Sequence, residues 1–317
     1  MQNHPVQTVS VIVPVFNESE VLPLFHRRLK DVLSKLPFNY EIIYINDGSG
    51  DGTWDLVNEL KNKEPQIALI DLSRNFGKEL ALSAGLDYAK GDAVVVIDAD
   101  LQDPPELIPE LLNHWQQGFD VIYAKRTTRH GETWFKKFSA HYFYKIIHRL
   151  SNIPIPEDTG DFRVLSKRAV FALRQCKEHH RFMKGLFSWI GFKQTAVLYE
   201  RAPRAKGETK WNYLKLWELA LEGITSFTIV PLKCASYLGF LTAFSAFLYA
   251  LFIIYKTLRF GESVQGYPSL MVVMLFLGGI QLITLGIIGE YLGRTFNESK
   301  QRPLYLVQDY QASDVQA

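Results

Sequence analysis

Five apolar runs recur along the N-terminal part of the chain, and stretches with helical spacing separate them. The runs are TVSVIVPV (8–15), YEIIYIND (40–47), IALIDLS (67–73), AVVVIDAD (93–100) and FDVIYAKR (119–126). The stretches between them predict helices over 20–36, 54–62, 79–89 and 105–117. Apolar strands that alternate with helices predict an α/β fold, with a mostly parallel sheet covered by helices on both faces.

Each predicted strand is followed by a polar or charged segment. In chain order these segments are PVFNESE, NDGSGDGT, SRNFGKE, DADLQD and AKRTTR. Ordinary loop polarity explains any one of them. Five in succession favour a binding site, because ligands of such sheets bind beyond the carboxyl ends of the strands.

Two long runs without formal charge lie near the C-terminus, at 234–255 and 263–289. Each meets the roughly 20 residues that a bilayer core requires, and the short loop between them predicts a transmembrane hairpin. The alternative is a pair of buried helices in a soluble protein. We divide the chain into a catalytic domain (1–210), an amphipathic juxtamembrane helix (211–231), two spans (232–256 and 268–293) and a cytoplasmic tail (294–317).

The flanking charges orient this hairpin. More Lys and Arg residues flank its outer ends than lie in its loop, once Lys206, Lys210 and Lys215 are counted. The positive-inside rule then places both termini in the cytoplasm, on the inner membrane. The N-terminus, which lacks the basic segment and apolar core of a signal peptide, points the same way.

A further stretch, 132–150, is amphipathic and rich in aromatic and basic residues. This composition predicts an interfacial helix on anionic lipid, and a core helix is the alternative. Small residues in the second span favour either self-association into a homo-oligomer or packing of the two spans; they are Gly278, Gly279, Gly286 and Gly289.

Composition excludes other classes. The net charge of +2 does not favour nucleic acid as a partner. The two cysteines, Cys176 and Cys234, lack metal-ligand spacing and fit a reducing compartment. The chain has neither a G-x-G-x-x-G after its first apolar run nor a P-loop, which disfavours a dinucleotide site.

The sharpest chemical feature is Asp98-Ala99-Asp100 at the end of the fourth run. If the strand continues to Asp100, both carboxylates point to one side, with Gln102 next in phase. Two close carboxylates repel each other, and a divalent cation with oxygen ligands offsets that repulsion. Asp103, just before Pro104, is interpreted instead as an acid at a helix start.

Together these segments resemble the family-2 glycosyltransferases with the GT-A fold. VSVIVPVFNE, NDGSGDGT and VVVIDADLQDPPE match that family in content and order. SRNFGKELALSAGLDYAKGD, DTGDFRVLSKR and RAPRAKGETKWN resemble its polyprenyl-phosphate glycosyltransferases, the group of dolichol-phosphate mannose synthase. The two spans are similar to those of the bacterial bactoprenol glucosyltransferases.

The resemblance implies inverting transfer of a sugar from a nucleotide diphosphate to a polyprenyl phosphate, aided by Mg²⁺ or Mn²⁺. It implies a metal at Asp98 and Asp100, which Gln102 assists, and an acceptor phosphate at Arg126. Lys136 and Lys137, in the predicted interfacial helix, are expected to add charge at the acceptor phosphate. Asp161 is implied near the transfer point with Arg163 as its partner, and Asp158 competes for that role. A helix cap with a salt bridge is the alternative for these three. The residues implied for the donor nucleotide are Pro14, Phe16, Glu18, Asp47, Lys78, Asp98, Arg204 and Lys210.

The resemblance leaves the sugar open. UDP-glucose is the first expectation, with GDP-mannose and an aminoarabinose-type donor as alternatives. A processive polysaccharide synthase is disfavoured because the chain has no Q-x-x-R-W motif. A catalytically silent membrane scaffold is the alternative that is not an enzyme, and intact Asp98, Asp100 and Arg204 argue against it.

Overall fold

The computed structural model describes residues 7–127, 156, 159–179, 181–200, 228–260 and 266–315. It divides into two compact units, Met1–Ala220 with Pro303–Ala317, and Leu221–Arg302. The predicted interfacial helix and most of the juxtamembrane helix lie outside the described residues. So do five predicted site residues, Lys136, Lys137, Asp158, Arg204 and Lys210.

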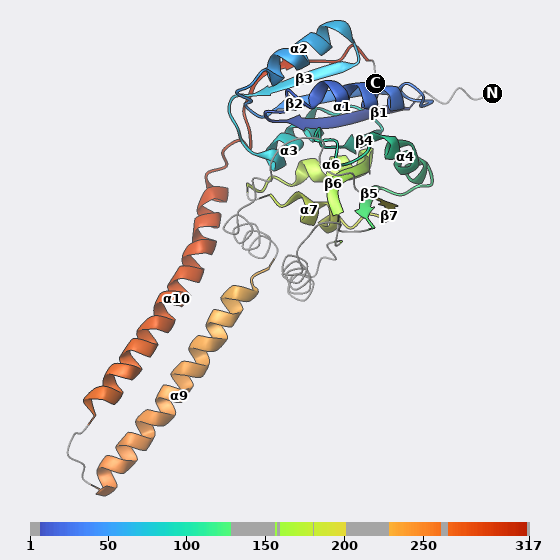
Figure 1. The fold of residues 1–317 in the computed structure, drawn as a ribbon. Coiled ribbons are helices and arrows are strands. Elements are labelled where there is room, and N and C mark those ends of the chain that lie inside the picture. Colours follow the sequence, from blue (N-terminus) through green and yellow to red (C-terminus); the bar gives the residue numbers. More distant parts are fainter. Residues whose placement is uncertain are drawn as a thin grey trace. The chain divides into compact units, whose positions relative to one another are not determined.

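The first unit is built on one eight-stranded sheet with the strand order β7-β5-β6-β4-β1-β2-β3-β8 (Figure 1). The strands are β1 Thr8–Val15, β2 Asn39–Asn46, β3 Ile67–Leu72, β4 Ala93–Val96, β5 Val121–Arg126, β6 Thr159–Ser166, β7 Gln194–Tyr199 and β8 Val307–Gln311. All five predicted strands are present, and β1 pairs in parallel with β2 and β4. The predicted fourth strand was too long, because β4 ends at Val96 rather than Asp100.

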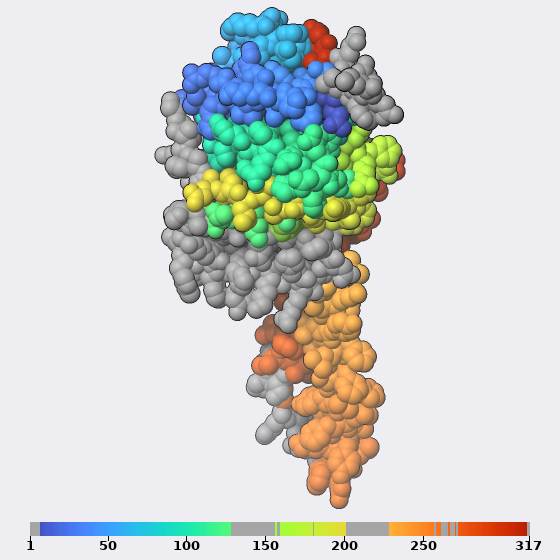
Figure 2. Space-filling view, turned by 90° about the vertical axis from the view of Figure 1, so that its right-hand side faces the viewer, coloured from blue at the N-terminus to red at the C-terminus, as the bar shows by residue number. Residues whose placement is uncertain are grey.

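Helices cover both faces of the sheet because both faces of the strands are apolar. The helices of this unit are α1 Leu22–Leu33, α2 Thr53–Lys63, α3 Lys78–Tyr88, η1 Pro105–Leu107, α4 Ile108–Gln116, α6 Lys167–Gln175 and α7 Met183–Trp189. Val11 and Val13 of β1 join the core under α1, α2 and α4. Ile12 faces α3 on the other side, where it lies against Gly85. Figure 2 shows the face covered by α2, α1 and α4.

Strand β6 was not predicted, and it decides the shape of the candidate site. It lies between β4 and β5 and pairs antiparallel with both. Its N-terminal end therefore lies at the edge where the parallel strands have their carboxyl ends. Asp161 and Arg163 reach that edge from within a strand, so the helix-cap alternative is wrong for these two residues.

Strand β7 was not predicted either, and the C-terminal segment adds a third unpredicted strand, β8. It pairs antiparallel with β3 at the edge of the sheet. The Ser313 hydroxyl donates to the buried Glu41 carboxylate at 2.8 Å, and the Tyr305 hydroxyl donates to Asp87 at 2.8 Å. Residues 303–317, predicted only as a tail, are therefore part of the first unit, to which both ends of the second unit connect.

The second unit consists of two long apolar helices, α9 Val230–Phe260 and α10 Tyr267–Ser299. Their most apolar segments have mean hydropathies of 2.0 and 2.2, and both are long enough to cross a bilayer. Their large apolar side chains are exposed, as Phe240 at 73% and Leu282 at 72% illustrate. Helices from the core of a soluble protein would bury these groups, so the structure favours the predicted hairpin.

The close contact of α3 with the sheet depends on a glycine. A Cβ atom at Gly85 would lie 2.4 Å from Cγ2 of the fully buried Ile12. We expect Gly85→Val to overpack this contact and destabilise the domain by about 2–3 kcal/mol. A thermal melt of the purified protein followed by circular dichroism should show a lower Tm. Gly50→Val is the matched control, because no described atom lies within 4 Å of a Cβ there. An unchanged Tm for Gly85→Val would contradict the tight contact.

Candidate active site

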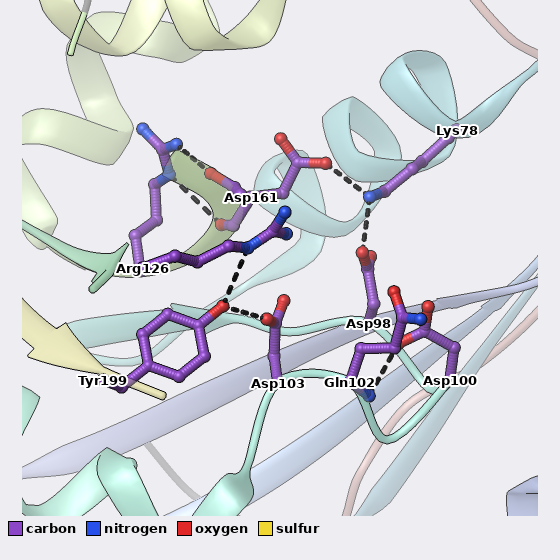
Figure 3. A network of polar contacts seen from close by, with 10 residues as sticks. Lys78, Asp98, Asp100, Gln102, Asp103, Arg126, Asp161 and Tyr199 are labelled. Carbon is purple, nitrogen blue, oxygen red and sulfur yellow. Dashed lines mark hydrogen bonds and ion pairs between the residues drawn. The ribbon is translucent and has the colours of Figure 1, made fainter. Parts of the chain in front are cut away.

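The two aspartates of the D-x-D motif lie on a turn rather than on a strand. After β4 ends, Leu101 adopts a left-handed φ of 59° and the chain reverses direction. The backbone N–H of Gln102 donates to Asp100 Oδ1 at 3.0 Å, which closes the turn. Asp98, Asp100 and Gln102 therefore occupy one short turn (Figure 3), and its geometry replaces the strand pleat as the reason for their grouping.

Asp103 has a different environment from the one predicted. It is 1% exposed and accepts a hydrogen bond from the hydroxyl of Tyr199, at the end of β7. Neither η1 nor α4 has a side-chain cap, so the interpretation of Asp103 as a helix-start acid is wrong. The turn before η1 points this carboxylate inward, toward β6, where a Cβ on Gly160 would lie 3.5 Å from it.

Tyr199 connects Asp103 to Arg126, the last residue of β5. Arg126 Nε donates to the Tyr199 oxygen at 3.3 Å (Figure 3). Burial and the neighbouring Asp103 carboxylate raise the pKa of Tyr199, so its hydroxyl stays neutral and keeps its proton for Asp103. Within the described part of the chain, the terminal nitrogens of Arg126 have no hydrogen-bond partner. A half-buried guanidinium with free donors is suited to an anionic ligand.

Lys78, in the first turn of α3, joins the D-x-D turn to β6. Its Nζ lies 2.7 Å from Asp98 Oδ2 and also donates to Asp161 Oδ2 (Figure 3). Desolvation by the surrounding protein opposes the charge of Lys78, whose side chain is 41% exposed, but the two carboxylates outweigh this effect and raise the pKa of the ammonium group. Burial likewise opposes ionisation of Asp161, but Lys78 and Lys184 hold the pKa of this carboxyl below its usual range.

The surroundings of Asp98 disfavour its negative charge. Burial and the charge of Asp161 raise the pKa of Asp98, and Lys78 offsets only part of this effect. The available ligands are carboxylate and amide oxygens, which suit Mg²⁺ or Mn²⁺. Among the described residues, no group of three or more His, Cys, Asp or Glu side chains is arranged to hold a metal ion by itself. This arrangement fits a cation that takes one or two carboxylates and completes its shell with substrate phosphates.

Arg163 does not pair with the Asp161 carboxylate as expected. Its guanidinium donates to the backbone carbonyls of Asp161, at 3.1 Å, and of Gly160, at 2.8 Å. It also lies 3.7 Å from the ring centroid of Phe187. Burial lowers the pKa of Arg163 to about 10, so it remains charged at neutral pH. Arg163 thus fixes the backbone that carries Asp161, whose Oδ1 is buried without a partner among the described residues.

Two charged residues next to this cluster were missed by the sequence analysis. Glu79 Oε2 accepts the backbone N–H of Met183 at 3.1 Å, which ties α3 to α7. Lys184 follows on α7, where burial and the charges of Lys78 and Arg163 lower its pKa. Glu79 adjoins Lys78 in sequence, but no spacing pattern links RFMKG to the site, so Lys184 gave no signal.

Hydrogen bonds and close packing connect the segments that are predicted to bind the nucleoside. The Asp47 carboxylate accepts the backbone N–H groups of Phe76, at 2.7 Å, and Gly77, at 3.0 Å. Gly48 has a φ of 69°, and a Cβ there would lie 2.5 Å from the nitrogen of Asn75. Asp47 therefore has an evident structural role, and its predicted contact with the nucleoside stays a prediction.

The end of β1 faces the same loops. The backbone N–H of Glu18 donates to Thr53 Oγ1 at 3.0 Å, and the Asn17 side chain accepts from the Gly50 N–H at 2.8 Å. Pro14 is half-buried, whereas the ring of Phe16 is 41% exposed beyond the strand. An exposed ring at this edge is consistent with the predicted base pocket.

Comparison with known proteins identifies the family. The profile of Glycosyl transferase family 2 matches residues 10–172. The chain belongs to glycosyltransferase family 2. A second profile, the GtrB C-terminal hairpin, matches residues 230–295. With the exposed apolar helices, this match marks this family-2 glycosyltransferase as a membrane protein and confirms the predicted α/β domain with a C-terminal hairpin.

Similar proteins span nearly the whole chain. An uncharacterized glycosyltransferase of Synechocystis is 54% identical over 95% of both chains. A bactoprenol glucosyl transferase of Shigella phage SfV is 47% identical over 95% of this chain and 98% of its own. Among solved structures, mannosyl-3-phosphoglycerate synthase from Rubrobacter xylanophilus has a TM-score of 0.48 at 17% identity, covering 68% of this chain and 71% of its own. The family profile and the bactoprenol glucosyl transferase relatives together identify the chain as a glycosyltransferase, against the scaffold alternative.

The environment of Glu79 predicts a pH-dependent stability. Burial, with the charge of Asp161, raises the pKa of Glu79 from 4.5 to about 7. Between these values the folded state holds a proton that the unfolded state has released, so stability falls as pH rises. Glu79→Gln removes this penalty. We expect the variant to gain about 1–3 kcal/mol relative to wild type between pH 5 and pH 8.

Melting temperatures at pH 5, 6, 7 and 8 measure this gain. Glu59→Gln on α2 is the matched control, because the Glu59 side chain is 65% exposed and, among the described residues, forms an ion pair only with Lys63. A constant difference between Glu79→Gln and wild type across this range would contradict the raised pKa.

Proposed function

We propose that this family-2 glycosyltransferase transfers glucose from UDP-glucose to a polyprenyl phosphate. One observation supports this proposal above all: Asp98, Asp100 and Asp161 lie at the same edge of the sheet as Arg126, whose terminal nitrogens are free among the described residues. A cation-binding turn for a diphosphate thus lies near a cationic group for a second phosphate. The names of the bactoprenol glucosyl transferase relatives support the choice of glucose and of a prenyl acceptor.

The reaction requires little acid–base chemistry. A phosphate oxygen of the acceptor, already anionic at neutral pH, attacks the anomeric carbon of the glucosyl group. The new C–O bond forms as the bond to the β-phosphate breaks, and the electron pair leaves with UDP. Because no proton must be removed from the nucleophile, the protein mainly positions the reactants and stabilises charge. A single displacement inverts the anomeric centre.

The site residues divide between the two substrates. Asp98 and Asp100, with Gln102, would hold a divalent cation that neutralises the leaving diphosphate. Arg126 binds the acceptor phosphate, held in place by Tyr199. Asp161, on a backbone that Arg163 fixes, would orient the sugar.

The acceptor is a membrane lipid, and the hairpin brings the enzyme to it. The catalytic domain contains both the chain before α9 and the chain after α10. If both helices cross the bilayer, the chain crosses it twice and returns to the side that it left. This is required, because the segments before α9 and after α10 belong to one domain. We place the domain in the cytoplasm, on the inner membrane, from the basic residues outside the spans.

A radiochemical assay tests the function. Full-length protein in detergent, with undecaprenyl phosphate, Mg²⁺ or Mn²⁺ and labelled UDP-glucose, should give a chloroform-soluble labelled lipid. Asp100→Asn should abolish turnover while leaving the circular dichroism spectrum unchanged. A faster reaction with GDP-mannose or an aminoarabinose-type donor would replace the sugar assignment. If no nucleotide sugar labels the lipid, the proposed function is wrong.

The Tyr199 hydroxyl is predicted to position Arg126 for the acceptor. Tyr199→Phe removes the hydrogen bonds to Arg126 and Asp103, and we expect the KM for polyprenyl phosphate to rise about fivefold. The KM for UDP-glucose should change little. Tyr305→Phe is the matched control, since its hydroxyl donates to Asp87 at 2.8 Å, outside the site. A rise confined to the donor KM would assign Tyr199 to the nucleotide side instead.

A further inference from the structure

Lys78 contacts the side chain that the proposed cation needs. Its ammonium lies 2.7 Å from Asp98 Oδ2, in the turn that also carries Asp100 and Gln102. A divalent cation and an ammonium group cannot both occupy this face of one carboxylate oxygen. We propose that Lys78 is an internal counter-ion that competes with the divalent cation for Asp98 and is displaced onto the diphosphate when cation and donor bind together.

The contacts of Lys78 make it suited to such an exchange. It bridges Asp98 and Asp161, which come from the turn after β4 and from β6. Without its charge, the buried Asp161 carboxylate and the partly exposed Asp98 carboxylate would lose the ammonium group that they share. Lys78 thereby holds the pair of carboxylates together while no donor is present.

The same side chain is able to leave. Lys78 is 41% exposed despite its two ion pairs. A lysine is a compact charge on a flexible four-carbon stem, so its ammonium can swing to a new anion without movement of the backbone. A donor diphosphate brought to the turn with a cation supplies such an anion.

Asp161 keeps a positive neighbour after the exchange. Lys184 on α7 interacts electrostatically with Asp161, as does Arg163. Among the described residues, the Lys184 ammonium has no hydrogen bond or ion pair of its own. Displacement of Lys78 therefore exposes only Asp98 to the cation, while the charge of Asp161 stays offset.

This exchange couples the two ligands. A cation alone must displace Lys78 with no new anion to receive it, so it binds weakly. A cation with a nucleotide diphosphate gives Lys78 a new partner, so each ligand strengthens the binding of the other. The coupling rests on the proposed nucleotide donor, but its first step involves only the cation and this chain.

A binding titration tests the proposal. Mn²⁺ is added to the full-length protein without nucleotide, and electron paramagnetic resonance measures the free Mn²⁺. We expect Lys78→Met to bind Mn²⁺ about tenfold more tightly than wild type, because the competitor for Asp98 is gone. Added UDP should tighten Mn²⁺ binding strongly in wild type and much less in the variant. Lys78→Arg, which keeps the charge, should bind Mn²⁺ as weakly as wild type.

Two further variants keep the result interpretable. Lys78→Gln replaces Lys78→Met if circular dichroism shows that the methionine variant is misfolded. Lys63→Met removes an exposed lysine whose one ion pair within the described part of the chain is with Glu59, and it should leave Mn²⁺ affinity unchanged. Mn²⁺ affinity in the folded Lys78→Met or Lys78→Gln variants that equals or falls below wild type would overturn the proposal.

The outcome is separable from that of the proposed function. Tighter Mn²⁺ binding in Lys78→Met, without glucose transfer by wild type, would support the counter-ion and reject the proposed reaction. Glucose transfer by wild type, with no gain in Mn²⁺ affinity on substitution, would do the reverse.

Discussion

The site depends on the compensation of carboxylate charge at one edge of the sheet. Asp98 and Asp161 are brought together from segments far apart in the sequence, and Lys78 lies between them. Two carboxylates that share one ammonium group repel each other once its charge is removed. The position of α3, whose first turn carries Lys78, is thus as important to the site as the D-x-D turn.

The packing of α3 on the sheet supports this arrangement of charges. Gly85 lets α3 approach Ile12 and Ile45 closely, which fixes the helix that carries Lys78 against the sheet. Glu79 then ties the first turn of α3 to α7 through the N–H of Met183. The ion pairs of Lys78 therefore depend on the apolar contact between α3 and the sheet. A displacement of α3 would disturb both.

A second set of polar contacts positions the acceptor side. Asp103, Tyr199 and Arg126 come from the turn before η1, from β7 and from β5, and one hydroxyl group connects them. Gly160 on β6 leaves room for the Arg126 guanidinium, because a Cβ at position 160 would lie 3.2 Å from one of its nitrogens. Asp103 and Asp98 are five positions apart, yet they have different partners. Asp103 is connected to Arg126 through the Tyr199 hydroxyl, whereas Asp98 accepts a hydrogen bond from Lys78.

The sequence by itself determined the elements that depend on local patterns. Apolar runs and helical spacing located the five parallel strands, the helices between them and the apolar hairpin, because burial and bilayer thickness impose these periods and lengths. Motifs located Asp98, Asp100, Arg126 and Asp161 through their family resemblance. Only the tertiary structure decided which of these side chains meet and what neutralises them.

The reason is physical. Strands β6 and β8 are antiparallel partners whose pairing depends on neighbours distant in the chain, and no local period specifies it. The end of β4 at Val96 and the left-handed Leu101 turned Asp103 inward, where sequence alone suggested a helix start. Lys184 carries no motif, and it matters only because α7 packs beside α3 through Glu79. Local patterns specify elements, whereas charge compensation depends on distances that exist only after those elements pack.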